Sequence, residues 1–428
     1  MKILFVTAGA AGMYCGSCLR DNALASELKA RGHDVLLVPL YTPTLTDEEN
    51  VSEPRVFFGG VSVYLQQHAG FFRWAPRLFD RLLDAPWLIK AASSGSISTN
   101  PRSLGELTLS MLKGEEGFQR KEFEKMLEWL RSEPAPDVVQ IPNALLSSLA
   151  RPFKRELKRP VHCTLQGEDL FLGGLQESHR EKALALIREH AQHVDRFTSV
   201  SEYYAGFMAA YLGIPAEKID VVPLGLNLNG FERRKESGPR PFTVGYLARI
   251  APEKGLLELC DAYVRFRQMA GVETARLEVA GYLAPDQKHY LNEAQRKLTK
   301  AGFGAEFKYH GMLDRLQKIE FLRGLDVFSV PTVYVEPKGL FLLEALGCGV
   351  PVVQPRHGAF PEMLAKTEGG VLVEPGNPQA LAEGFYRLWK DPGLRATLGE
   401  NGFKGVRLHY SVARSADRML EVYERSLA

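Results

Sequence analysis

Two short apolar runs flank a glycine-rich turn and a helical pattern at the start of the chain, and this order constrains the fold most. The runs are residues 2–8 (KILFVTA) and 33–40 (HDVLLVPL). Between them, the leucines of LRDNALASELKARG recur at helical spacing, and Gly32 ends that segment. Strand, turn, helix and strand in this order predict a βαβ unit of a parallel sheet.

The same alternation continues along the chain in two series, separated by a linker near residues 226–240 that is rich in proline, glycine and charge. The further strands are expected at 137–141, 161–165 and 196–200 in the first series, and at 242–249, 275–283, 307–311, 327–333, 350–355 and 370–375 in the second. We therefore expect an α/β protein with two Rossmann-like, doubly wound domains that face a cleft.

The linker sets the expected domain boundaries at 1–225 and 226–410, and a chain of 428 residues suits two domains of about 200 residues each. Residues 71–132 indicate helices inserted into the first domain. The last helix, 411–428, is expected to pack back on that domain. Ligands of such sheets lie beyond the carboxyl ends of the strands, so the binding turns belong there.

Charge and composition exclude several classes of protein. Hydrophobic residues make up 45% and charged residues 24%, as in ordinary globular proteins, and the net charge of +2 carries no nucleic-acid footprint. The first apolar run is too short for a membrane span and predicts a buried strand. Five cysteines at irregular positions fit reduced thiols. We expect a cytoplasmic protein; a peripheral location at the inner membrane face is the alternative.

Two carboxylates, Glu336 and Glu344, flank a glycine turn that opens a predicted helix (LFLLEALGC). The free N–H groups and the dipole of a helix N-terminus favour a diphosphate. Glu344 could accept hydrogen bonds from vicinal ribose hydroxyls, and Glu336 from a sugar. This geometry suits a sugar nucleotide. The alternative is a helix-terminal charge and a solvated glutamate.

A second candidate segment, GYLARIAPEKG, ends a predicted strand and places Arg249 and Lys254 on one loop. Two cations at the carboxyl end of a strand can neutralise a diphosphate and its leaving-group charge without a metal. As isolated residues they would be ordinary surface charges. Their occurrence in one chain with the Glu336–Glu344 segment favours a shared site.

The N-terminal turn, AGAAGMYCGSC, leaves other functions open. It lacks the G-x-G-x-x-G fingerprint, which disfavours a Rossmann oxidoreductase. Cys15 and Cys18 form a C-x-x-C pair at a strand-to-helix turn, the position of a redox pair. With His162 and Cys163 the pair could make a zinc site, although small thiols that pack a tight turn are the simpler interpretation.

These segments together resemble the retaining GT-B fold glycosyltransferases of family 4. GYLARIAPEKG resembles the family's donor-phosphate loop, VEPKGLFLLEALGCGVPVV its E-x7-E segment, and HGAFPEM the residues that follow. The N-terminal glycine loop with LASELKARGHDV, and SVSEYYAGFMAAYLGIPAEKIDVVPLGLNLNGFE, resemble the family's first half. The likeness is specific in 240–410, looser in 1–225 and weakest in 41–135.

The resemblance implies an acceptor-binding first domain, a donor-binding second domain, and transfer of a hexose with retained configuration. The donor is a nucleotide-diphosphate sugar, UDP- or GDP-linked. No cofactor or metal is implied, and the leaving phosphate helps to deprotonate the acceptor hydroxyl. Catalytic roles fall on Arg249, Lys254 and Glu336, the first two at the diphosphate and the third at the donor sugar. Donor-binding roles fall on Gly16, Gln166, Lys338, Gly339, Leu340 and Glu344, the last at the ribose.

Three positions depart from the family pattern. Gln166 stands where many relatives have a histidine that meets the donor sugar, Cys15 replaces a glycine, and Lys338 replaces an aromatic residue. Glutamine can hydrogen-bond a sugar hydroxyl but does not titrate. Glu168 and Asp169 become candidates for contacts with the acceptor, and Asp169 has the alternative of capping a helix.

The main alternative is a catalytically silent sugar-nucleotide-binding protein, suggested by Gln166. The Rossmann oxidoreductase is a second, weaker alternative. The acceptor can be a small molecule, a glycan or a lipid-linked molecule, and nucleic acid is not expected as a partner. The aromatic and basic residues 71–90 could touch a membrane surface, but core packing is favoured.

Overall fold

The computed structural model describes residues 1–9, 15–58, 63, 66–67, 101–233 and 240–428. The chain divides into two compact units, Met1–Gly225 with Ser415–Ala428, and Leu226–Arg414. We refer to them as the first and second unit and describe each by itself. Residues 71–90, the segment considered for membrane contact, lie outside the described residues. No helix in the described part of the chain has the length and apolarity to cross a membrane.

The first unit is built on a six-stranded parallel sheet with the order β2-β1-β3-β4-β5-β6. Its strands are β1 (Lys2–Thr7), β2 (Asp34–Pro39), β3 (Val138–Ile141), β4 (Val161–Leu165), β5 (Arg196–Ser199) and β6 (Ile219–Val221). Ile3 pairs with Val35 on one side and Val138 on the other. The first βαβ unit is therefore confirmed, whereas β6 was not predicted because its three half-buried residues make too short a pattern.

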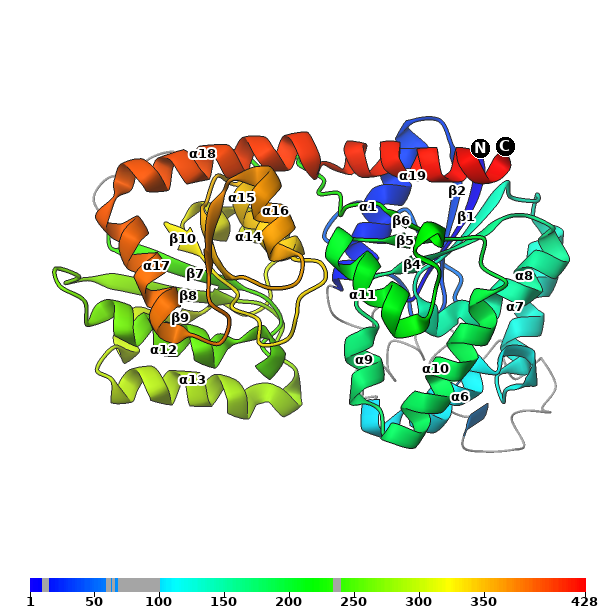
Figure 1. The fold of residues 1–428 in the computed structure, drawn as a ribbon, viewed down its shortest axis with the longest axis horizontal. Coiled ribbons are helices and arrows are strands. Elements are labelled where there is room, and N and C mark those ends of the chain that lie inside the picture. The colour runs from blue at the N-terminus through cyan, green and yellow to red at the C-terminus, as the bar shows by residue number, and fades with distance from the viewer. Residues whose placement is uncertain (10–14, 59–62, 64–65, 68–100, 234–239) are drawn as a thin grey trace. The chain divides into compact units, whose positions relative to one another are not determined.

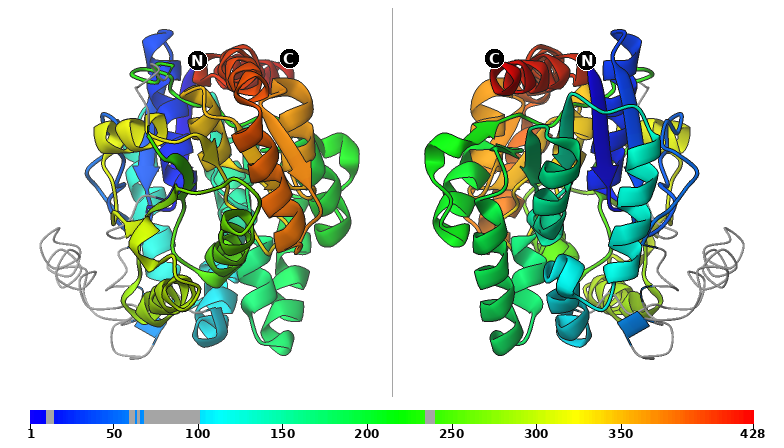
Figure 2. Two further views of the ribbon diagram at one scale, coloured as in Figure 1. Left: turned by 90° about the vertical axis from the view of Figure 1, so that its left-hand side faces the viewer. Right: turned by 90° about the vertical axis from the view of Figure 1, so that its right-hand side faces the viewer.

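Helices cover both faces of this sheet (Figure 1). On one face lie α1 (Gly16–Ala30) and α19 (Val412–Leu427), whose apolar side chains share a buried cluster with β1, β2 and β3. The other α-helices among the described residues of this unit are α6 (Gly105–Leu112), α7 (Arg120–Ser132), α8 (Ala150–Leu157), α9 (Asp169–Gly174), α10 (Glu177–Ala191) and α11 (Glu202–Leu212). Figure 2, right, shows β1 and β2 side by side in blue, with the red C-terminal helix next to them.

The second unit holds another six-stranded parallel sheet, with the order β12-β11-β10-β7-β8-β9. Its strands are β7 (Phe242–Leu247), β8 (Ala275–Ala280), β9 (Phe307–Tyr309), β10 (Val327–Phe328), β11 (Val352–Pro355) and β12 (Gly370–Val373). Because β7 lies inside the sheet while β8 and β10 are its two neighbours, the strand order reverses there. Ligands of doubly wound sheets lie at such a reversal.

Helices also cover both faces of the second sheet (Figure 1). One face carries α12 (Leu256–Arg267), α13 (Lys288–Lys300) and α17 (Pro378–Lys390); the other carries α14 (Arg315–Arg323), α15 (Leu340–Gly347) and α16 (Phe360–Thr367), over which α18 (Pro392–His409) packs. Two doubly wound parallel sheets confirm the predicted fold class.

One strand of this unit differs from the expectation, and the expected linker is packed at its start. The strand expected at 327–333 is only two residues long, because Pro331 has no N–H for a ladder and the chain turns into the loop that precedes α15. The start of the expected linker is packed, since Leu226 exchanges backbone hydrogen bonds with Tyr410 and Val412, and Phe231 is buried. The apolar residues at the start of this segment therefore pack against the second unit, although the segment as a whole is polar.

Candidate functional site

The N-terminus of α15 is set by Gly339, which precedes the helix with a φ of 72°. That left-handed conformation favours glycine. A side chain there would also meet Phe360 Cε1 at 3.1 Å and Met363 Sδ at 3.2 Å. Leu340 is the first helical residue, so its N–H lacks an acceptor within the helix. The predicted turn and helix are thus confirmed as elements, and their role in binding stays a prediction.

Glu336, just before this turn, is buried and paired with Lys254 from the loop after β7. Lys254 Nζ lies 2.6 Å from Glu336 Oε2, and the two side chains are 16% and 2% exposed. The backbone N–H of Lys338 donates to Glu336 Oε1 over 3.3 Å. The structure therefore brings together two residues that are 82 positions apart in sequence and were assigned to one site.

Aromatic rings complete the surroundings of this ion pair. Lys254 Nζ lies 5.0 Å from the ring centroid of Tyr334 and 5.5 Å from that of Phe341, within cation–π range. Burial opposes ionisation of Glu336, but the charge and hydrogen bond of Lys254, aided by Lys338 and Tyr334, outweigh it and lower the pKa of Glu336. The carboxylate of Glu336 is therefore ionised at neutral pH.

The loop after β11 holds the backbone of Glu336 in place. Ala359 N donates to Glu336 O over 2.9 Å, and a Cβ on Gly358 would lie 2.2 Å from that oxygen, so only glycine fits. His357 in the same loop places Nε2 3.5 Å from Thr332 Oγ1. Burial lowers the pKa of His357, although the Glu336 carboxylate acts in the opposite direction.

Arg249 is on the same loop as Lys254 but forms its ion pair with Glu253 and is 42% exposed. The loop itself is anchored, since Ile250 N donates to Tyr282 O over 2.8 Å and Tyr246 Oη to Arg249 O over 3.3 Å. The described contacts therefore join Lys254 to Glu336, whereas Arg249 contacts neither. Its assigned place at a diphosphate stays a prediction.

Glu344 has its own lysine. Lys318 Nζ on α14 lies 2.6 Å from Glu344 Oε1 on α15, and the side chains are 10% and 8% exposed. Sequence reasoning missed Lys318. The sequence does contain a signal for it: Lys318 lies on the apolar side of α14, next to Ile319 and Leu322, where an apolar residue is expected. A lysine at such a position needs a buried partner.

The residues assigned to the first unit occupy the ends of its strands and helices. Gly16 is the first residue of α1. Gln166, just after β4, is buried, and its Nε2 donates to Pro142 O over 2.7 Å. Its Oε1 is also buried and has no hydrogen-bond partner among the described residues. This oxygen can therefore accept a hydrogen bond from a hydroxyl group.

Glu168 and Asp169 are both bound within the first unit. The carboxylate of Glu168 accepts hydrogen bonds from Ala144 N at 3.0 Å and Gln166 N at 2.7 Å, and burial raises its pKa. The hydroxyl of Tyr204 donates to Asp169 Oδ1 over 2.7 Å. Asp169 begins α9 and does not occupy its cap position, so the capping alternative is wrong. An acceptor role for these two carboxylates stays a prediction.

The cysteines carry no disulfide. Cys15 precedes α1, and the thiol of Cys18 is buried behind it, with Thr7 Oγ1 4.0 Å from its Sγ. A hydrogen bond with Cys15, together with burial, raises the pKa of Cys18. No cluster of three or more His, Cys, Asp or Glu side chains with metal-site geometry occurs in the described part of the chain, so the zinc alternative finds no support.

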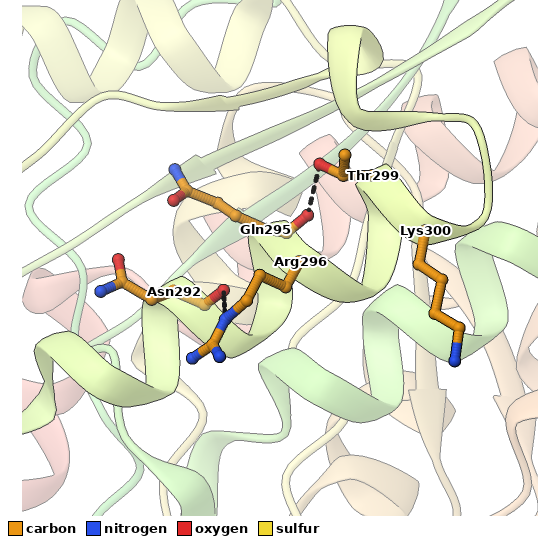
Figure 3. Close-up of a pocket in the computed structure, with 5 residues that line it drawn as sticks. All are labelled: Asn292, Gln295, Arg296, Thr299 and Lys300. Carbon is orange, nitrogen blue, oxygen red and sulfur yellow. Dashed lines mark hydrogen bonds between the residues drawn. The ribbon is translucent and has the colours of Figure 1, made fainter.

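A surface pocket lies apart from these residues, on the polar side of α13 (Figure 3). Its lining residues are Asn292, Gln295, Arg296, Thr299 and Lys300. Two of them hydrogen-bond to their own helix: Arg296 Nε donates to Asn292 O over 3.2 Å, and Thr299 Oγ1 to Gln295 O over 2.9 Å. None of the residues assigned from sequence lines this pocket, and we place no function there.

Two family models match the chain in succession. The model described as "Glycosyl transferase 4-like domain" matches residues 22–225, and "Glycosyl transferases group 1" matches residues 230–405. The first match lies in the first unit and the second in the second unit.

Relatives of known sequence point the same way. An uncharacterized glycosyltransferase of Methanocaldococcus jannaschii is 30% identical over 181 residues, 42% of this chain and 44% of that protein. The MMP alpha-(1->4)-mannosyltransferase of Mycolicibacterium hassiacum is 26% identical over 239 residues, 56% of each chain. The chain thus spans about half the length of the curated relatives it matches.

Solved structures share the fold over almost the whole chain. Sucrose-phosphate synthase from Thermosynechococcus elongatus superimposes with a TM-score of 0.72 at 17% identity, covering 99% of this chain and 98% of that one. HepE from Anabaena, solved in complex with UDP, gives a TM-score of 0.68 at 19% identity, with 99% and 100% covered. At such identities the likeness establishes the architecture.

Proposed function

Because the chain belongs to the group 1 glycosyltransferases, with a glycosyltransferase 4-like domain in its first half, we propose that it transfers a sugar from a nucleoside diphosphate to an acceptor hydroxyl. The observation that carries this proposal is the buried Lys254–Glu336 pair beside the N-terminus of α15. A cation, a carboxylate and free backbone N–H groups within one unit suit a phosphorylated sugar.

Each residue has a distinct part in the proposed reaction. Lys254, with Arg249, neutralises the diphosphate and stabilises the charge that develops on it as the bond from the sugar C1 to phosphate oxygen breaks. The N–H groups of Gly339 and Leu340 face the same anion. Glu336 accepts hydrogen bonds from donor-sugar hydroxyls, and Glu344 from the ribose. The Lys254–Glu336 pair must loosen on binding, because both partners then contact the ligand.

The finer assignments are part of the proposal. The acceptor oxygen forms its bond to C1 on the face that the phosphate leaves, so the configuration is retained. The acceptor proton passes to a leaving phosphate oxygen, which removes the need for a protein base. UDP and GDP sugars are the first donors to test: HepE was solved with UDP, and one relative is named as GDP-mannose-dependent.

The test is nucleotide release from a panel of UDP, GDP and ADP sugars, with and without candidate acceptors. Purified wild-type protein should release nucleoside diphosphate from one donor, and Lys254→Ala should reduce kcat/KM by about 100-fold or more, as expected for removal of a transition-state cation. Lys297→Ala is the matched control, because Lys297 also forms a 2.6 Å ion pair, with Asp261, but on α13. Undiminished release by Lys254→Ala would refute this site.

A catalytically silent binding protein is the second candidate, and Gln166 is the observation that favours it. The amide is fixed by Pro142 and cannot take up or release a proton. Under this alternative, a sugar nucleotide raises the unfolding temperature of the wild type but no panel donor is consumed with any acceptor. Consumption of the stabilising donor would eliminate it. Family membership already removes the oxidoreductase alternative.

A further inference from the structure

The two glutamates around the α15 turn are each paired with a different lysine. Glu336 contacts Lys254, which sequence analysis had assigned to the site, and Glu344 contacts Lys318, which nothing had assigned. Lys254 lies in the loop after β7, and Lys318 lies on α14. The second pair therefore requires its own explanation.

We propose that Lys318 is a positioning residue that fixes the carboxylate of Glu344 for the ribose hydroxyls of the donor, and so determines selectivity for ribonucleotides. This inference rests on the proposed function. Lys318 contacts the carboxylate, and Glu344 contacts the ligand. The recognised chemistry is a vicinal diol of a nucleoside diphosphate.

The first supporting observation is the geometry of the pair. Nζ and Oε1 are 2.6 Å apart, and both side chains are about nine-tenths buried. Such a short, charge-assisted contact fixes one carboxylate oxygen in direction. A carboxylate has about four lone-pair positions, so Glu344 keeps acceptor capacity for hydroxyl donors.

The second observation is the rigidity of the support. Asp314 caps α14 through a hydrogen bond from Gln317 N at 2.9 Å, and the Gln317 side chain accepts from Asp314 N at 3.1 Å, which forms a capping box. Lys318 lies one residue later, in the first turn. α14 also packs against α15, so both members of the pair sit on helices that contact each other.

The third observation concerns the energetics of the pair. A buried ion pair seldom stabilises a protein more than well-packed apolar residues of the same volume do. A Lys–Glu pair that joins α14 to α15 in the candidate site is better explained by orientation of the carboxylate than by stability.

The experiment measures binding of ribo- and 2′-deoxyribonucleoside diphosphates by calorimetry, with UDP, GDP and ADP as probes. Wild-type protein should bind one ribonucleotide at least about tenfold more tightly than its 2′-deoxy form, the usual effect of a hydrogen bond to a charged group. Lys318→Met should bring this ratio close to one while affinity for the deoxy form changes little. Lys318→Arg should keep most of the preference, and Lys297→Met, a control on α13, should keep all of it.

The outcomes separate this inference from the proposed function. Failure of the wild type to bind any probe would overturn both. A wild-type preference that persists in Lys318→Met would overturn the role of Lys318 alone. If Lys318→Met does not fold, Lys318→Met/Glu344→Gln replaces it, because removing both charges leaves no unpaired buried ion. The double variant should bind both forms equally, and a retained preference for the ribose form would overturn the inference.

Discussion

At the scale of single residues, the most informative side chains are buried charges and buried titratable groups. The carboxylates of Glu336 and Glu344 each form an ion pair with a lysine; Glu336 lies just before the turn that opens α15, and Glu344 lies within the helix. Each of these two buried carboxylates therefore has a cationic partner within the protein itself. Under the proposed function, a diphosphate sugar would share Lys254 with Glu336, so its binding would require a local rearrangement of this pair.

His162 gives a prediction for pH. Its ring is fully buried in β4 beside Tyr423, with centroids 5.3 Å apart, and burial lowers its pKa from 6.5 to about 4. Between pH 6.5 and 4 the unfolded chain binds a proton that the folded chain does not, so stability falls as pH falls through this window and levels off below it. The two pKa values correspond to a loss of about 3 kcal/mol.

The check is denaturant unfolding at pH 7.5 and pH 4.5. His162→Leu should lose about 2–3 kcal/mol less than the wild type over this interval, because the leucine has no proton to bind. His289→Leu replaces an exposed histidine and should behave as the wild type. Equal losses in His162→Leu and wild type would show that His162 is not buried in neutral form.

The cysteines give a second prediction at this scale. Cys15 is half-buried at the start of α1, whereas Cys18, Cys163, Cys260 and Cys348 are buried. A hydrogen bond with Cys15 and burial raise the pKa of Cys18, which suppresses its reactive thiolate. Brief treatment of native protein with iodoacetamide should label Cys15 first, as read by mass spectrometry of peptides, and label the others after unfolding. Rapid labelling of native Cys18 would contradict this packing.

At the scale of elements, α14 connects stability to the candidate site. Asp314→Ala removes its capping box and should lower the free energy of unfolding by about 1 kcal/mol. Asp391→Ala is the matched control, because Asp391 caps α18 through Leu394 N at 2.9 Å. Both variants should lose similar stability, but only Asp314→Ala should weaken nucleoside diphosphate binding, since α14 carries Lys318. If the two variants bind nucleoside diphosphate equally well, α14 does not contribute to the site.

Some of these strands and helices could be predicted from the sequence, and others could not. Strand β4 was predicted at 161–165 and found there, because five buried residues bounded by turns make a clear pattern. The turn and helix around Gly339 were also confirmed. β10 is shorter than expected because proline interrupts its ladder. Lys318 was missed because its partner, Glu344, lies on another helix, and the sequence around Lys318 does not indicate which residue it pairs with.

At the scale of the whole molecule, the chain returns to its first unit only in its last fourteen residues, Ser415–Ala428. Within that unit, Ala416, Met419, Val422 and Tyr423 of α19 pack against α1, β1 and β3 in one buried cluster. The Tyr423 hydroxyl also donates to Gln140 Oε1 in β3 over 3.1 Å. The C-terminal helix α19 is thus part of the same hydrophobic core as the N-terminal elements β1 and α1.

Removal of residues 415–428 should therefore destabilise the first unit and spare the second. Exposure of the α1 side of the sheet should lower the stability of the first unit by on the order of 5 kcal/mol, from the apolar surface that α19 covers. Hydrogen exchange should show lost protection in β1 and β3 and retained protection in β7 and β8. Removal of Leu427 and Ala428 alone is the control, because Leu427 is 42% exposed and contributes little to the core. Loss of protection in β7 and β8 to the same extent as in β1 would mean that the two units unfold as one, and the division of the chain at Arg414 would then have no energetic meaning.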